Sequence, residues 1–171
     1  RKMLSKRHLV IVAALMAIWA SANCNAMVLA EDGQAKAVIV VAPGASEPVQ
    51  HAAKELADFL GQITGGRFEI ANGKRPDGSA ICVGPQAARS VDPTFLTGGL
   101  GHEGIVIKTV KDDLILAGGE PRGTLYAVYT FLEDYLGCRW WSSTESTIPK
   151  KPTIQIGQID LRYTPILEYR E

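Results

Sequence analysis

The sequence predicts an α+β fold, a two-layer arrangement in which two main helices pack on one face of a mixed β-sheet. Three observations support this class. Continuous β-branched and apolar runs indicate buried strands, two separate segments carry apolar residues at helical spacing, and a short polar turn joins two further strands as a hairpin. With 171 residues, 46% hydrophobic and 21% charged, the chain suffices for one globular domain but is short for two.

The first residues are typical of a secretory signal peptide, which we assign to residues 1–26. Lys2, Lys6 and Arg7 precede an unbroken apolar run, residues 9–20, which is too short for a comfortable membrane span. Small residues follow the run, as they do before a cleaved bond. We therefore expect an exported protein, periplasmic or extracellular, with no stable membrane span after cleavage.

The cleavage position stays open, because small residues make Ala22, Ala26 and Ala30 all suitable, and we favour the last two. A lipoprotein is an alternative, since Cys24 follows the apolar run, but Asn23 is a poor residue to precede a lipidated cysteine. A retained anchor helix is a further alternative.

The first strand and helix follow one another closely. Residues 36–42 form a β-branched run that ends at a Pro-Gly pair, as expected of a buried strand. Ser46 and Pro48 suit the start of a helix, and a Gly-Gly pair at 65–66 ends it. The apolar positions of this helix recur at helical spacing and comprise Val49, Ala52, Ala53, Leu56, Leu60 and Ile63. His51, Lys54, Glu55 and Asp58 fall on its other face, where we expect solvated charge.

Four strands are expected in the middle of the chain. Two short ones, residues 67–71 and 80–84, flank a polar turn segment rich in Gly, Asn and Pro. Two more, residues 104–110 and 114–118, flank Lys111-Asp112-Asp113 and predict a hairpin.

The second helix and the tail complete the domain. The helix follows a glycine-rich loop, buries Leu125, Val128, Leu132 and Leu136, and ends at Gly137. The next four residues, Cys-Arg-Trp-Trp, look extended, and the alternating tail is β-prone.

Charge and cysteine content exclude several classes of partner and cofactor. The 18 basic and 18 acidic residues cancel, so the sequence has no basic footprint for nucleic acid or for an anionic membrane. Cys82 and Cys138 are expected in buried strands, either as two thiols or as one disulfide. Neither has a partner at metal-ligand spacing, and we expect no metal.

The loop Gly118–Thr124 resembles a phosphate-binding loop in its glycine spacing only. Thr124 stands where such a loop needs a lysine to reach the phosphates, and Pro121 removes one backbone donor. A tight turn between strand and helix is the favoured interpretation. A nucleotide-binding protein is therefore disfavoured, and we expect no cofactor.

Catalytic motifs are missing from the sequence. It has neither HExxH nor GxSxG, which makes a hydrolytic triad or a zinc protease improbable. Glu133 and Asp134 are adjacent on a helix, so they point in different directions and do not form the carboxylate pair of a glycosidase. We predict no catalytic residue in this chain.

One long segment carries a family resemblance. "RGTLYAVYTFLEDYLGCRWW" (122–141), preceded by "LILAGGEP" and followed later by "TPILEYRE", resembles the N-terminal domain of large bacterial α-glucuronidase-like glycoside hydrolases. These are related to glycoside hydrolase family 67 and include relatives of unassigned function. "AAKELADFLGQITGG" and "AICVG" fit the same pattern.

The resemblance implies a non-catalytic α+β accessory domain, similar to the one in family 20 hexosaminidases, over residues 35–163. Residues 164–171 would then start the connection to a (β/α)₈ catalytic barrel, absent here, that carries the acid and base. The implied parent is a secreted hydrolase acting on glucuronosyl side chains of xylan or on another glycan, with this chain inactive alone. The alternative is a free-standing exported carbohydrate-binding or interaction module.

Three residues are candidate carbohydrate contacts. The resemblance places Arg170 at the entry to the barrel, near a substrate pocket of the full-length protein. Trp140 and Trp141 could stack on a sugar ring, since an aromatic face packs on the apolar face of a pyranose. Adjacent strand residues face opposite sides, so we expect one ring in the core and the other exposed or packed on the barrel.

Overall fold

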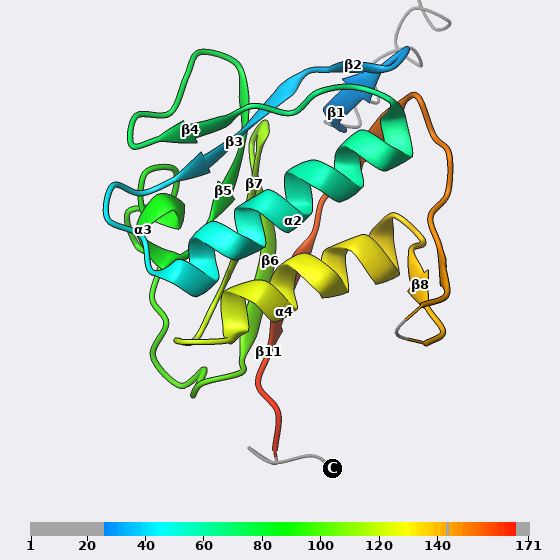
Figure 1. Ribbon diagram of the computed structural model, residues 1–171. Helices are drawn as coiled ribbons and strands as arrows, with labels where there is room; N and C mark the ends of the chain where they lie inside the picture. The colour runs from blue at the N-terminus through cyan, green and yellow to red at the C-terminus, as the bar shows by residue number, and fades with distance from the viewer. Residues whose placement is uncertain (1–25, 143, 167–171) are drawn as a thin grey trace, which may run out of the picture.

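A six-stranded mixed sheet forms the centre of the computed structural model, which describes residues 26–142 and 144–166. Its strand order is β11-β6-β7-β5-β3-β4 (Figure 1). The strands β4, β3, β5 and β7 run parallel, whereas β6 is antiparallel to both of its neighbours. The strands are β3 (Ala37–Val41), β4 (Ile70–Asn72), β5 (Ser79–Val83), β6 (Ile105–Val110), β7 (Asp113–Gly118) and β11 (Asp160–Tyr163).

Two helices lie side by side across one face of this sheet, as predicted (Figure 1). They are α2 (Glu47–Thr64) and α4 (Gly123–Thr130), and α4 continues as a π-helical segment, η1 (Phe131–Tyr135). Ser46 occupies the N-cap of α2 but makes no side-chain capping bond, while Gly65 ends the helix in the left-handed conformation. The expected α+β class, with two main helices on one face of a mixed sheet, is confirmed.

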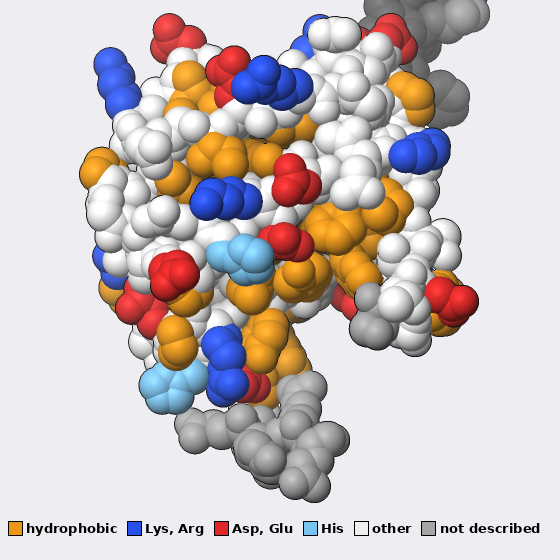
Figure 2. Space-filling view, viewed as in Figure 1, with side chains coloured by type: hydrophobic (Ala, Val, Ile, Leu, Met, Phe, Trp, Pro, Cys, Tyr) orange, Lys and Arg blue, Asp and Glu red, His pale blue; other side chains and the backbone are white. Residues whose placement is uncertain are grey.

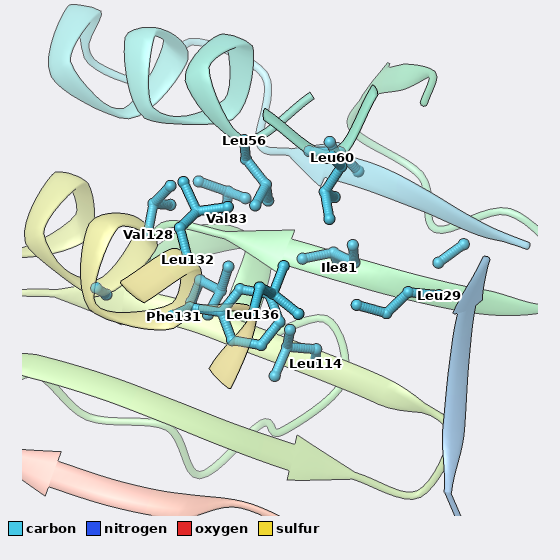
Figure 3. Close-up of a cluster of buried hydrophobic side chains, with 14 of the residues drawn as sticks. Leu29, Leu56, Leu60, Ile81, Val83, Leu114, Val128, Phe131, Leu132 and Leu136 are labelled. Atoms are coloured by element: carbon cyan, nitrogen blue, oxygen red, sulfur yellow. The ribbon is translucent and has the colours of Figure 1, made fainter. Parts of the chain in front are cut away.

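The main core lies between these helices and the sheet (Figure 3). All six predicted apolar positions of α2 are buried there. From the second helix Val128, Leu132 and Leu136 are buried, and Leu125 is partly buried. Alternate residues of the strands complete the layer, because successive side chains of a strand face opposite sides. The labelled side chains of Figure 3 show leucines of both helices meeting Ile81, Val83 and Leu114 of the sheet.

The opposite face of the sheet is also covered, which the sequence pattern did not predict. A four-residue helix, α3 (Pro85–Ala88), and the loop that follows it pack there. Phe95 and Leu100 of this loop are buried with Cys82 and Ile115. The segment has no periodic pattern in its sequence, so its contribution to the second core is visible only in the structure.

The two described cysteines lie in separate cores and are free thiols. Cys82 belongs to the second core, and burial raises the pKa of its thiol to about 11. Cys138 belongs to the core beneath the helices, in the turn before β8 rather than in a strand. The sequence left open whether Cys82 and Cys138 form a disulfide or stay as two thiols, and in the structure they are two thiols.

A second, three-stranded sheet, of order β10-β1-β2, joins the two ends of the described chain. It consists of β1 (Met27–Glu31), β2 (Gln34–Ala35) and β10 (Ile154–Ile156). In β1, Met27, Leu29 and Ala30 are buried in the main core. Strand β1 thus precedes residue 35, the expected start of the domain, and it overlaps the segment in which we expect signal cleavage.

Two strand segments differ in extent from the prediction. The strand expected at 67–71 starts only at Ile70, and the Trp-Trp segment forms a two-stranded hairpin, β8 (Arg139–Trp140) with β9 (Ser146–Thr147). The predicted signal peptide, apart from residue 26, and Cys24 lie outside the described residues. None of the helices within the described ranges combines the length and apolarity that crossing a membrane requires.

Candidate interaction surface

The glycine-rich loop between β7 and α4 is a packed turn. The Gly119 N–H donates to the Gly104 carbonyl at 2.9 Å, and the Gly123 N–H donates to the carbonyls of Gly119 and His102 at 2.7 and 3.0 Å. A Cβ on Gly119 would collide with the Gly101 carbonyl oxygen, so glycine is required by close backbone approach. These two amides are already engaged and do not point to a phosphate.

Acidic side chains of the described residues do not gather into a metal site. Between residues 26 and 142 and between 144 and 166, no group of three or more His, Cys, Asp or Glu could hold a metal ion. Glu133 lies 3.7 Å from Arg139 in an exposed ion pair, and its neighbour Asp134 is also exposed.

Trp140 belongs to an aromatic cluster that joins β8 to both helices. Its ring meets Phe59 of α2 and Tyr129 of α4 edge to face, at centroid distances of 5.4 and 5.3 Å. The side chain remains 36% exposed. Edge-to-face contacts of this kind add to the stability that area burial provides.

Trp141, the next residue, is 69% exposed. Its indole N–H donates to Thr147 Oγ1 at 3.0 Å, which fixes the ring against β9. Both rings are therefore exposed, and the expectation that one of them lies in the core is wrong. Sugar contact by either ring remains a prediction, and Arg170, the third candidate, lies outside the described residues.

Tyr129 is the central residue of the aromatic cluster. Its hydroxyl donates a 2.8 Å hydrogen bond to Glu55 Oε2. Burial and this carboxylate both disfavour the phenolate, and together they raise the pKa of Tyr129 to about 12. The phenol is therefore a permanent hydrogen-bond donor at neutral pH.

A groove of about 670 Å³ runs along the side of α4 that faces away from α2, where Figure 2 shows the surface hollowed. Arg122 and Glu103 form an ion pair at 2.6 Å on its wall, with the Glu103 side chain only 14% exposed. The groove is lined by Glu103, Ile105, Arg122, Tyr126, Tyr129, Thr130, Glu133, Asp134, Leu161, Tyr163 and Pro165.

Sequence patterns did not predict this groove, because its walls come from β6, α4 and β11, which are distant along the chain. The only local signal was the pair of tyrosines, Tyr126 and Tyr129, outside the apolar face of the predicted helix. Apolar rings beside a few fixed polar groups form the usual lining of a binding surface. The groove is thus a candidate recognition surface within the described ranges.

Comparison with protein families gives one result of direct relevance. The model of the family described as "Glycosyl hydrolase family 67 N-terminus" matches residues 7–131, well over half of the chain. The match includes β1 and most of the central sheet, and it ends before Trp140 and Trp141. A search of curated proteins finds no match.

Proposed function

Because this chain belongs to the glycosyl hydrolase family 67 N-terminus family, we propose that it is the non-catalytic N-terminal domain of a secreted, α-glucuronidase-like glycoside hydrolase. In this proposal a (β/α)₈ catalytic domain follows on the same polypeptide and supplies the acid and base. The substrate is a polysaccharide side chain, such as the glucuronosyl branches of xylan. The protein acts in the periplasm or in the medium.

The family match is the observation that carries this proposal. A glycosidase needs two carboxyl groups facing one sugar, about 5 to 9.5 Å apart across a cleft. Glu133 and Asp134 are sequence neighbours on η1 and lie, exposed, on the same border of the groove.

The test compares the chain alone with a polypeptide extended through the domain that follows. Both are assayed on aldouronic acids and on aryl glycosides. We expect hydrolysis only by the extended protein, and the Asp112→Asn variant, an exposed carboxylate of this domain outside the groove, should retain full activity. Hydrolysis by the chain alone would overturn the proposal. N-terminal sequencing of protein recovered from periplasm and medium checks export separately.

A free-standing carbohydrate-binding module is the second candidate, favoured by the 69% exposure of the Trp141 ring. Titration calorimetry of the chain with xylo-oligosaccharides tests this candidate. Binding that is lost in Trp141→Ala but kept in Tyr135→Ala, an aromatic control that is also exposed, would support it. Absence of heat with both acidic and neutral oligosaccharides would remove it.

A further inference from the structure

The parallel strands of the central sheet end at one common edge. Strand β5 is parallel to both β3 and β7, so the carboxyl ends of the three strands lie side by side there. After β5 the chain enters α3, which packs with Cys82 and Ile115 on one face of the sheet. After β7 the chain enters α4, whose Ala127 and Val128 pack on the opposite face. The chain therefore leaves two neighbouring strands towards opposite faces.

A cavity of about 300 Å³ lies between the ends of β5 and β7, where the two connections diverge. Both connections line it. Pro85, Gln86 and Arg89 come from α3 and its C-cap, and Gly119 and Glu120 come from the turn before α4. In open sheets, ligands bind outside the carboxyl ends of parallel strands at such a point of divergence. The strand topology and the cavity thus indicate the same position independently.

The third wall of this cavity is the loop before β6, which contributes Thr97 and Gly101. Arg162 of β11 donates to the backbone carbonyls on either side of Thr97, at 3.1 and 2.7 Å. The Nδ1–H of His102 donates to the backbone carbonyl of Glu120 at 2.6 Å, which ties this loop to the turn before α4. The cavity is therefore formed before any ligand arrives, as ligand sites usually are.

Hydrogen-bonding side chains dominate the lining of this cavity. Arg89 offers donors only and Glu120 offers acceptors only, so their formal charges cancel. The Gln86 amide and the Thr97 hydroxyl offer both. Among the described residues, the Arg89 guanidinium donates only through Nε, to the Phe95 carbonyl at 3.4 Å. Its two terminal nitrogens are thus available to a ligand.

We propose that this cavity binds one neutral monosaccharide unit. A pyranose presents adjacent hydroxyl groups that each donate and accept, so one ring satisfies a guanidinium and a carboxylate together. The volume is at the lower end of the range for ligand pockets, which suits a single ring. This inference goes beyond the proposed function and does not depend on it.

Ionic ligands fit the same lining less well. An anion such as phosphate would meet the Glu120 carboxylate, and the backbone amides of Gly119 and Gly123 already donate to carbonyls. A cation would meet the guanidinium of Arg89. A ligand without net charge avoids both repulsions.

Titration of the isotope-labelled chain with D-xylose and with D-glucose, followed by amide NMR, tests this proposal. We expect dissociation constants in roughly the millimolar range, as for ligands of about ten heavy atoms. The amide signals that shift should include those of Arg89, Gly101, Gly119 and Glu120. Unchanged signals at these four residues with both sugars, well above that concentration range, would overturn the inference. Tighter binding of inorganic phosphate or of D-glucuronate would overturn it as well.

Substitutions of the two charged side chains provide a second measurement. Both side chains are exposed, so the variants should fold as wild type does, which circular dichroism checks. Glu120→Gln and Arg89→Gln should each weaken D-xylose binding about tenfold, the usual effect of losing a charged hydrogen-bond partner. Glu120→Gln should at the same time improve binding of D-glucuronate, because the repelling carboxylate is gone. A purely structural role of Glu120 would not change the selectivity in this way.

Asp112→Asn, an exposed carboxylate outside the cavity, is the matched control and should bind D-xylose as wild type does. Loss of binding in Trp141→Ala, with Glu120→Gln unaffected, would place the sugar at the β8–β9 hairpin and overturn the inference. Hydrolysis by the extended polypeptide tests the proposed function separately, so the two proposals can fail independently.

Discussion

The hydroxyl of Tyr129 on α4 and the carboxylate of Glu55 on α2 are joined by a 2.8 Å hydrogen bond. The ring of the same tyrosine packs edge to face on Trp140, which belongs to the β8–β9 hairpin. One side chain therefore connects both helices to the hairpin that follows them. Its removal should loosen this corner of the domain while leaving the sheet unchanged.

Tyr129→Phe keeps the ring contacts and deletes only the hydroxyl. We expect the free energy of unfolding to fall by about 1 kcal/mol, the usual net value of one such bond at a partly exposed position. Urea denaturation followed by circular dichroism measures the change. Tyr135→Phe, on the neighbouring turn, is the control and should be neutral. An equal loss in the two variants would contradict a specific role for the Tyr129–Glu55 bond.

Alkaline pH should weaken the same interaction. The pKa of Tyr129 is raised from 10 to about 12 in the folded protein, so folding favours the neutral phenol. Its contribution is complete below pH 10, the unfolded value, and declines as the pH rises towards about 12. The stability difference between wild type and Tyr129→Phe should therefore shrink over this interval, as followed by urea denaturation at stepped pH. If the stability difference stays constant up to pH about 12, the raised pKa of Tyr129 does not contribute to it.

Asp113 anchors the loop before β5 to the start of β7. Its carboxylate accepts hydrogen bonds from Arg75 Nε and Nη2 at 3.0 and 2.9 Å, and from the Ala80 N–H at 2.9 Å. The side chain is nearly buried, so Asp113→Ala leaves a buried amide without a partner and releases the guanidinium. We expect a loss of about 3 kcal/mol in thermal or urea unfolding.

The exposed neighbour provides the matched control for this carboxylate. Asp112→Ala should change stability by less than about 0.5 kcal/mol, since surface substitutions without partners seldom cost more. Similar losses at both positions would show that local charge, rather than the Asp113 contacts, supports the turn.

Local patterns predicted those parts of the fold that depend on periodicity within one segment. Helix α2 and its buried residues follow from spacing alone, and the β6–β7 hairpin follows from two apolar runs around a polar turn. Strand β1 could not be found in this way, because its pairing with β10 involves residues at the other end of the chain. The loop that buries Phe95 has no repeat to detect.

Of the candidate surface, the tryptophans could be predicted from the sequence and the groove could not. The tryptophans were singled out as aromatic neighbours on a strand, with one ring expected in the core. Both are exposed instead, at 36% and 69%, because β8 ends at Trp140 and strand alternation does not extend to Trp141. The groove beside α4 was invisible, since Glu103, Tyr126 and Tyr163 come together only after the sheet has formed. A sequence pattern reports which residues share a face of one element, and a groove between elements requires their relative placement.

The N-terminal boundary of the domain can be tested by truncation. A chain that begins at Met27 keeps all of β1, whereas one that begins at Glu31 lacks the buried Met27, Leu29 and Ala30. We expect the shorter chain to lose at least about 4 kcal/mol, because each large buried side chain is worth about 2–5 kcal/mol. Thermal unfolding of the two chains measures this loss.

The same pair of chains bears on signal cleavage. If the fold needs β1, cleavage after Ala22 or Ala26 preserves the fold and cleavage after Ala30 does not. Mass spectrometry of the exported protein identifies which of the three bonds is cleaved. A mature protein that begins at Glu31 and is as stable as the longer chain would show that β1 is dispensable.

Gly119→Ala tests the packed-turn interpretation of the glycine-rich loop. The added Cβ would meet the Gly101 carbonyl oxygen, and either the loop or the strand must shift. We expect destabilisation of about 3 kcal/mol in urea unfolding. Gly98→Ala is a suitable control, since nothing lies within 4 Å of the position that its Cβ would occupy and its backbone conformation is ordinary. Equal stability of the two variants would argue that the loop is open rather than packed.

The pairing of Met27 with Ile156 has a consequence for the order in which the domain is made. Strand β1 leaves the ribosome early, yet its hydrogen-bonding partner β10 is synthesised only near the end of the described chain. Strand β11 completes the central sheet later still, beside β6. Contacts between such distant segments form slowly, so β1 and β6 each keep one edge unpaired until synthesis of this region is almost finished.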